Sequence, residues 1–107
     1  MELSISLGYL QGSRTTKGKV RSLEAAARIC REAGFRYVNH CSNLLDPDWE
    51  RRAHEDKEIL DREGIIVEQT HAPYNRYSRF TLEEFPEIFH RAFVVASILG
   101  AENVVVR

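Results

Sequence analysis

Residues 64–74 read Gly-Ile-Ile-Val-Glu-Gln-Thr-His-Ala-Pro-Tyr, and this stretch decides the interpretation of the whole chain. A glycine is typical of the left-handed position that ends a helix. The residues from Ile65 to His71 are rich in apolar and β-branched side chains, which predicts a strand. His71 therefore closes the strand, and a loop is expected from Ala72 to Arg79.

The segment before Gly64 is predicted to be a helix. Asp46-Pro47 provides an N-cap followed by a proline at the first helical position, and the helix is expected to run to about Glu63. Its apolar face is thin, so the helix should lie on the outside of the molecule. The residues in front of it, Phe35 to Cys41, are predicted to form a short strand.

The amino-terminal part repeats this pattern. Residues 3–8 alternate apolar and small polar side chains, which indicates a strand with two different faces. Ser22 caps a run of apolar residues at helical spacing, and Gly34 stands where that helix would end. The apolar positions of the run are Leu23, Ala26, Ile29, Cys30 and Ala33.

The carboxyl-terminal part adds a third helix and a fourth strand. Thr81 and Glu84 have the spacing of a capping box at a helix start. Pro86 indicates instead that the regular helix begins only at the proline, because proline removes a backbone donor. Gly100 ends the helix, and the unbroken valines of residues 101–107 predict a strand that is buried on both faces.

The predicted order is βαβαβαβ. Strands that alternate with helices at this interval pair in parallel through crossovers, so the fold class is α/β. This order suits either a doubly wound sheet or half of a (β/α)8 barrel. The segment from Tyr9 to Arg21 is not the glycine-rich turn that opens directly into a helix in doubly wound nucleotide-binding folds, which favours the barrel.

Composition narrows the class of protein. The chain has 107 residues, is 43% apolar and 29% charged, and has a formal net charge of -1, so no overall field favours nucleic acid or membrane. Its two cysteines, Cys30 and Cys41, are not placed to suggest a disulfide, which suits a reducing compartment. The start lacks a signal-like pattern and no long apolar run occurs, so a soluble cytoplasmic protein is expected.

Four motifs lie in register along the chain. They are Ala33-Gly34-Phe35, Gly64-Ile65, His71-Ala72-Pro73-Tyr74, and Leu99-Gly100-Ala101 followed by Glu-Asn-Val-Val-Val. Together they resemble the xylose-isomerase-like TIM barrels, which include sugar and sugar-phosphate isomerases or epimerases and the endonuclease IV group (AP endonuclease family 2). That family often carries an acid near the end of the second strand, where this sequence has Asn39.

The resemblance implies a single domain over residues 1–107, the N-terminal half of a (β/α)8 TIM barrel with four parallel strands and three helices. Complete barrels need eight strands and about 250 residues. This half is therefore expected to contain only part of an active site and to be inactive alone. A divalent metal (Zn, Mn or Mg) is implied for the complete barrel, with most ligands on its later strands. The half-barrel is expected to bind metal weakly or not at all.

His71 is the leading candidate site residue, because it ends a strand at the face where barrel enzymes build their sites. Its imidazole can ligate a metal or hydrogen-bond a substrate oxygen. The resemblance implies a metal ligand in the nuclease group and a substrate contact in the isomerases; a histidine bonded to a loop is the structural alternative. Tyr9, Asn39 and Tyr74 stand at predicted strand ends on the same side, where they would bind a polyol or pack against loops.

The remaining histidines and Glu68 are given structural roles. His54 and His90 fall on helical stretches and are expected to be solvated or packing residues. His40 is expected to point toward the helix layer. Glu68 lies three residues before His71 and is expected to face the other way, so it is not assigned as a general base.

Two predicted loops, Tyr9–Arg21 and His71–Phe80, contain no Asp or Glu and hold six of the chain's 15 basic residues. An anionic ligand, such as a phosphorylated sugar or a nucleic-acid backbone, would explain this bias. A solvated loop surface is the alternative. Arg14 and Arg76 are the substrate-binding candidates among the basic residues, which are Arg14, Lys17, Lys19, Arg21, Arg76 and Arg79.

Three functions from different classes stay open. The first is part of a metal-dependent sugar or sugar-phosphate isomerase or epimerase, and the second is an endonuclease IV-like phosphodiesterase fragment acting on DNA. The third is a non-catalytic, truncated half-barrel. Under each of them the unpaired edge strands are expected to cause self-association, and no membrane partner is expected.

Overall fold

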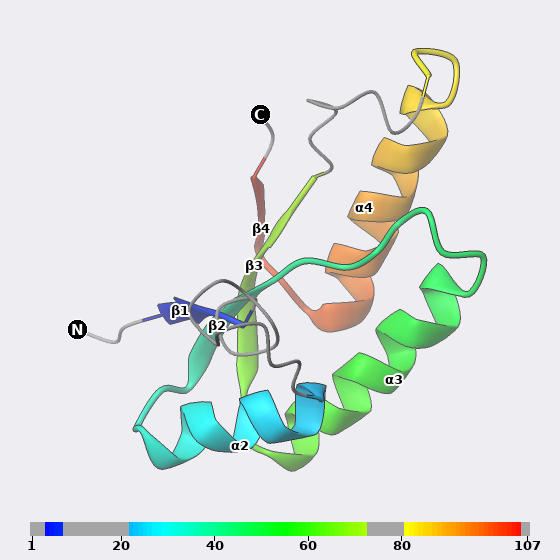
Figure 1. Ribbon diagram of the computed structural model, residues 1–107. Helices are drawn as coiled ribbons and strands as arrows, with labels where there is room; N and C mark the ends of the chain where they lie inside the picture. The colour runs from blue at the N-terminus through cyan, green and yellow to red at the C-terminus, as the bar shows by residue number, and fades with distance from the viewer. Residues whose placement is uncertain (1–3, 8–21, 73–80, 106–107) are drawn as a thin grey trace, which may run out of the picture.

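The computed structural model describes residues 4–7, 22–72 and 81–105, and Figure 1 shows the arrangement. Strands and helices alternate along the chain, as the sequence predicts. The strands are β1 (Ser4–Ser6), β2 (Tyr37–His40), β3 (Ile66–His71) and β4 (Asn103–Val105). The helices are α2 (Leu23–Glu32), α3 (Trp49–Arg62) and α4 (Phe85–Leu99).

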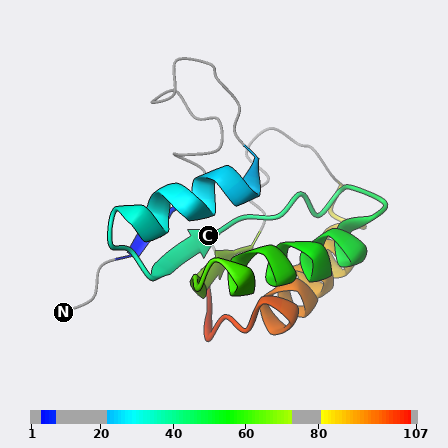
Figure 2. The ribbon, with the colours of Figure 1, turned by 90° about the horizontal axis from the view of Figure 1, so that it is seen from below.

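The strands form one parallel sheet in the order β1-β2-β3-β4. Consecutive strands are neighbours throughout, which is the arrangement of a barrel half rather than of a doubly wound sheet, whose order changes direction at a switch point. Figures 1 and 2 show α2, α3 and α4 along one side of this sheet, with α3 packed against both α2 and α4. The fold is therefore α/β and half of a TIM barrel, which confirms the prediction.

The sheet has two different sides. The side against the helices carries Val38 and Val67, which are 0% and 3% exposed and belong to the hydrophobic core. The other side, which no described helix covers, is called the open side here. Side chains on it are half-buried or exposed, and they are Ser4, Ser6, Tyr37, Asn39, Ile66, Gln69, His71, Asn103 and Val105.

One irregularity changes the phase of β3. Val38 pairs with Val67, but the next residue, Asn39, pairs with Gln69, so Glu68 is an additional residue in β3. Such a bulge bends its strand and shifts the alternation of side chains by one position. As a result Val67 and Thr70 both face the helices although they are three residues apart.

The helix ends follow the sequence closely. Gly34, Gly64 and Gly100 all have positive φ angles, of 92°, 69° and 75°, as expected of residues that end helices. The start of α2 is also as predicted, because Ser22 Oγ accepts a hydrogen bond from the backbone N–H of Ala25 at 3.2 Å.

The start of α3 differs from the prediction. The helix begins at Trp49 with Asp48 as its N-cap, not at Pro47 with Asp46 as the cap. Asp46 is used one turn earlier: its carboxylate accepts from the backbone N–H of Asp48 at 2.8 Å, and its carbonyl accepts from that of Trp49 at 3.0 Å. The aspartate therefore stabilises a turn that leads into the helix, and it lies two residues before the N-cap Asp48.

The start of α4 combines the two predicted alternatives. Thr81 and Glu84 form reciprocal hydrogen bonds, with Glu84 N–H donating to Thr81 Oγ1 at 3.3 Å and Thr81 N–H donating to Glu84 Oε1 at 3.1 Å. Residues 82–84 nevertheless form a turn, and the helix begins at Phe85, next to Pro86. The proline thus decides where the regular helix starts, while the Thr81–Glu84 pair closes the turn before it.

No disulfide joins Cys30 and Cys41. Burial raises the pKa of the Cys30 thiol above its ordinary value, so the thiol stays neutral in the core. Within the part of the chain that the structure describes, no helix is long and apolar enough to span a bilayer.

Candidate functional site

His71 is the last residue of β3 and lies on the open side, half-buried. Its register partner on β4 is Val105. The carboxyl ends of parallel strands are the edge at which barrel enzymes bind their substrates. The imidazole has no hydrogen bond to another described residue, so both ring nitrogens are available to a ligand at this edge.

Asn39 lies on the same side, one strand away. It pairs with Ser6 of β1 and with Gln69 of β3, which is two residues before His71. Ser4 Oγ donates a hydrogen bond to Asn39 Oδ1 at 3.1 Å and so fixes the side-chain amide. The structure therefore brings Asn39 and His71 onto one face of neighbouring strands, within a diagonal step of each other.

The other predicted site residues cannot be compared with these two. Tyr9, Arg14, Tyr74 and Arg76 lie outside the described residues, as do the basic loops that carry the anion hypothesis, apart from His71 and Ala72. That hypothesis stays a prediction from the sequence.

Gln69 and Asn103 were not among the residues predicted from the sequence. Both lie on the open side, and the register pairs them with each other and, through Gln69, with Asn39. Simple alternation counted along β3 would place Gln69 on the helix side, together with Val67. Only the bulge at Glu68 places it on the open side, and no local feature of the sequence signals that bulge.

The bulge also affects the interpretation of Glu68. Glu68 lies three residues before His71, and in a regular strand this odd spacing places two side chains on opposite faces of the sheet. Because Glu68 is itself the additional residue of the bulge, the spacing does not decide which face its side chain occupies. Glu68 is exposed and lines a cavity of about 370 Å³ together with Glu102 and Tyr37. This cavity lies at the amino ends of the strands, so it does not coincide with His71 at the opposite end.

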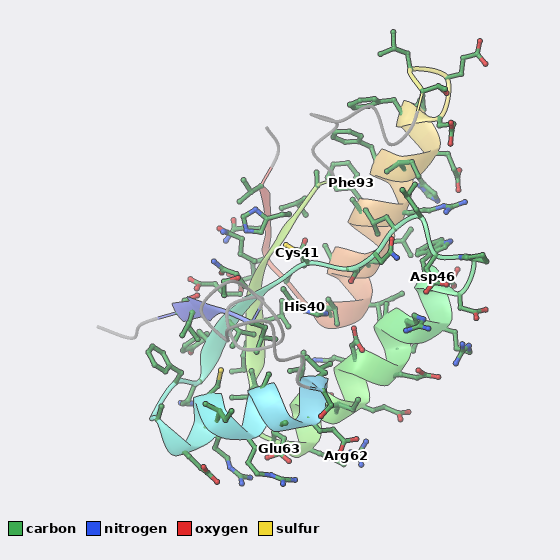
Figure 3. The ribbon with its side chains drawn as sticks, viewed as in Figure 1. His40, Cys41, Asp46, Arg62, Glu63 and Phe93 are labelled. Carbon is green, nitrogen blue, oxygen red and sulfur yellow. The ribbon has the colours of Figure 1, made fainter. Side chains whose placement is uncertain are left out.

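The helix side carries one polar contact near the site. His40 is 5% exposed, and its Nε2 lies 3.0 Å from Asp56 Oδ2 of α3, which confirms that it points toward the helices. Figure 3 shows His40 between the sheet and the helices. Its register neighbour Thr70 is 4% exposed, and Thr70 Oγ1 has no hydrogen-bond partner in the described part of the chain.

The loop after β2 is held in place by side chains from two helices. Arg91 of α4 donates from Nη1 to the carbonyl of Leu44 at 2.8 Å, and its guanidinium lies 5.5 Å from the ring centre of Trp49. Arg52 Nε lies 2.8 Å from Asp46 Oδ2. The end of β2 that carries Asn39 is therefore followed by an ordered connection.

His54 and His90 are exposed on α3 and α4, as expected of solvated residues. Among residues 4–7, 22–72 and 81–105, no group of three or more His, Cys, Asp or Glu side chains could hold a metal ion. His71 alone is too few ligands for a metal site, because catalytic zinc sites use at least three.

A solved structure supports the fold. The chain is similar to a xylose isomerase domain protein from Alicyclobacillus acidocaldarius subsp. acidocaldarius, with a TM-score of 0.62 and 24% sequence identity over 97% of this chain. The match spans 35% of that protein's chain, about a third of its length. At this identity the likeness shows the fold alone, and it confirms the resemblance to xylose-isomerase-like barrels at that level. No family model matches the sequence, and no curated protein matches it significantly.

Proposed function

We propose that this half-barrel is part of a cytoplasmic sugar or sugar-phosphate isomerase or epimerase. The observation that carries the proposal is the position of His71 and Asn39, on one open side of the sheet toward the carboxyl ends of β3 and β2. This is the edge where barrel enzymes place their substrates. The similarity in fold to a xylose isomerase domain protein agrees with it.

The two side chains would bind and orient the substrate. A neutral imidazole at His71 offers one donor and one acceptor to a sugar oxygen. The Asn39 amide, whose oxygen accepts from Ser4, has its Nδ2 group left to donate to a second oxygen. Two such contacts fix the direction of a sugar chain relative to the strands.

The proton transfer of an isomerase needs further groups. Moving a proton between neighbouring carbons requires a base near the substrate. In the described part of the chain, Glu68 and Glu102 line the cavity at the amino ends of the strands and are not near His71. A base and the ligands of any divalent metal would therefore be residues additional to those that the structure describes.

Titration of the labelled chain with a ribose phosphate tests the proposal. We expect the imidazole signals of His71 to shift in a saturable way, and His71→Ala to weaken binding about fivefold, the value of one net hydrogen bond. His54→Ala is the matched control, because His54 is exposed on α3. Free ribose should shift the same imidazole signals with lower affinity if an anion-binding group lies nearby.

A ribose phosphate that leaves the His71 signals unchanged would contradict the proposed function. Tighter binding of a duplex with an abasic site than of the sugar phosphate would also contradict it. That second result would favour the endonuclease IV-like alternative.

A further inference from the structure

Four uncharged polar side chains lie in one row across the open side of the sheet. The register pairs Ser6 with Asn39, Asn39 with Gln69, and Gln69 with Asn103. Each of the four strands contributes one member. Neighbouring strands are about 4.8 Å apart, so these side chains form a continuous hydrogen-bonding surface, called the polar row here.

Much of the hydrogen-bonding capacity of the polar row has no partner among the residues that the structure describes. Ser6, Asn39 and Gln69 are half-buried and Asn103 is exposed. The hydrogen bond from Ser4 occupies only the amide oxygen of Asn39. The side chains of Gln69 and Asn103 make no hydrogen bond to another residue in the described ranges. A half-buried amide without a partner is available to a polar ligand that replaces its water.

The chemistry of the row selects hydroxyl groups. Amide and hydroxyl side chains both donate and accept, and so does each hydroxyl of a polyol. The row contains no charged side chain, so an ionic group placed against it would lose its hydration without gaining a counter-charge. The adjacent open-side pair toward the amino ends is Tyr37 and Ile66, whose apolar surfaces suit the C–H groups of a carbon chain.

We propose that the polar row is a subsite for the hydroxyl-bearing carbon chain of an uncharged polyol, with His71 at the carboxyl end of the subsite. The inference deepens the proposed function and rests on it, because it assigns the part of the substrate that crosses the strands. Gln69 and Asn103 thereby become specificity-determining residues. The competing role is a purely structural polar layer inside a closed sheet, which the experiment distinguishes.

Side-chain amide spectra of the labelled chain provide the test, with ribitol as the probe. We expect saturable shifts of the NH₂ signals of Asn39, Gln69 and Asn103 with ribitol, and none with a pentanediol of the same carbon number. Gln69→Leu keeps the approximate size of the side chain but removes its amide, and should weaken ribitol binding about fivefold. Ser97→Leu, which also replaces an uncharged polar side chain by leucine but at an exposed position of α4, should leave the binding unchanged.

The possible results separate this inference from the proposed function. If the ribose phosphate shifts His71 but ribitol leaves the polar row unchanged, the subsite is wrong and the function stands. If ribitol shifts the row and the ribose phosphate does not affect His71, the subsite stands and the proposed function is wrong. Equal shifts with ribitol and pentanediol, or a Gln69→Leu variant that is less stable but binds ribitol as before, would assign the row to the structural layer.

Discussion

His40 shows how one residue supports the site from the opposite side of the sheet. It follows Asn39 directly, is 5% exposed and contacts Asp56 of α3 through Nε2 at 3.0 Å. Because a carboxylate only accepts hydrogen bonds, Nε2 is the protonated nitrogen in this contact. The pair attaches the end of β2 to the helix layer, so the position of Asn39 depends on a contact that Asn39 itself does not make.

Removing the partner of His40 should therefore destabilise the protein. Asp56→Ala would leave a buried imidazole N–H without an acceptor, at a cost of about 1–3 kcal/mol in the free energy of unfolding. Urea unfolding followed by circular dichroism measures this cost. Asp61→Ala is the control, because it breaks the solvent-exposed pair with Lys57 at 3.0 Å and should cost no more than about 0.5 kcal/mol. Equal effects of the two variants would show that the buried contact is not stabilising.

At the level of helices and strands, the sequence predicts ends better than beginnings. The glycines at the ends of helices are local signals, because positive φ at Gly34, Gly64 and Gly100 depends on the glycine itself. The starts of α3 and α4 differ from the predicted caps because Asp46 and Thr81 form hydrogen bonds in turns that precede the helices. Asp46 and Thr81 therefore accept hydrogen bonds from backbone N–H groups, but these groups belong to the preceding turns and not to the first turn of the helix.

The candidate site was predictable only in part for a similar reason. His71 and Asn39 could be predicted because each stands near the end of a strand in the sequence itself. The polar row could not be predicted from the sequence. Gln69 and Asn103 belong to it only because of the register in which neighbouring strands pair. That alignment includes a bulge that is a property of strand pairing rather than of either strand alone.

The turn before α4 allows a direct test of the Thr81 hydroxyl. Thr81→Ala removes the group that accepts from Glu84 N–H and donates to Glu84 Oε1, and should lower the free energy of unfolding by about 1 kcal/mol. Thr81→Ser keeps the hydroxyl and should be close to the wild type in the same urea titration. If serine were as destabilising as alanine, the methyl group rather than the hydrogen bonds would hold the turn.

At the level of the whole molecule, the sheet ends on both sides with a strand that pairs with only one described neighbour. β1 pairs with β2 alone and β4 with β3 alone, so each has a row of backbone donors and acceptors facing outward. Phe93 on α4, a helix that packs against both β3 and β4, is 52% exposed and adds apolar surface to the molecule (Figure 3). Such edges pair with other strands unless they are blocked.

We expect the chain to self-associate through β1 and β4, with an average mass that rises with concentration in sedimentation velocity or light scattering. Val105→Lys places a charge on the β4 edge and should shift the distribution toward the monomer. Ser97→Lys adds the same charge at an exposed position of α4 and should not. A monodisperse monomer at all concentrations of the unchanged protein would overturn this expectation.

Because Glu68 is an additional residue in β3, the strand could lose it without moving the later side chains to the opposite face of the sheet. Deleting Glu68 would restore plain alternation, and Val67, Gln69, Thr70 and His71 would keep the sides they have now. Only the bend of the strand, and with it the direction in which His71 points, would change. A deletion in the middle of a strand usually moves every later side chain to the opposite face of the sheet. At Glu68 it would leave those faces unchanged and alter the direction of one imidazole, so a related sequence that is one residue shorter here should be aligned with a gap inside the strand.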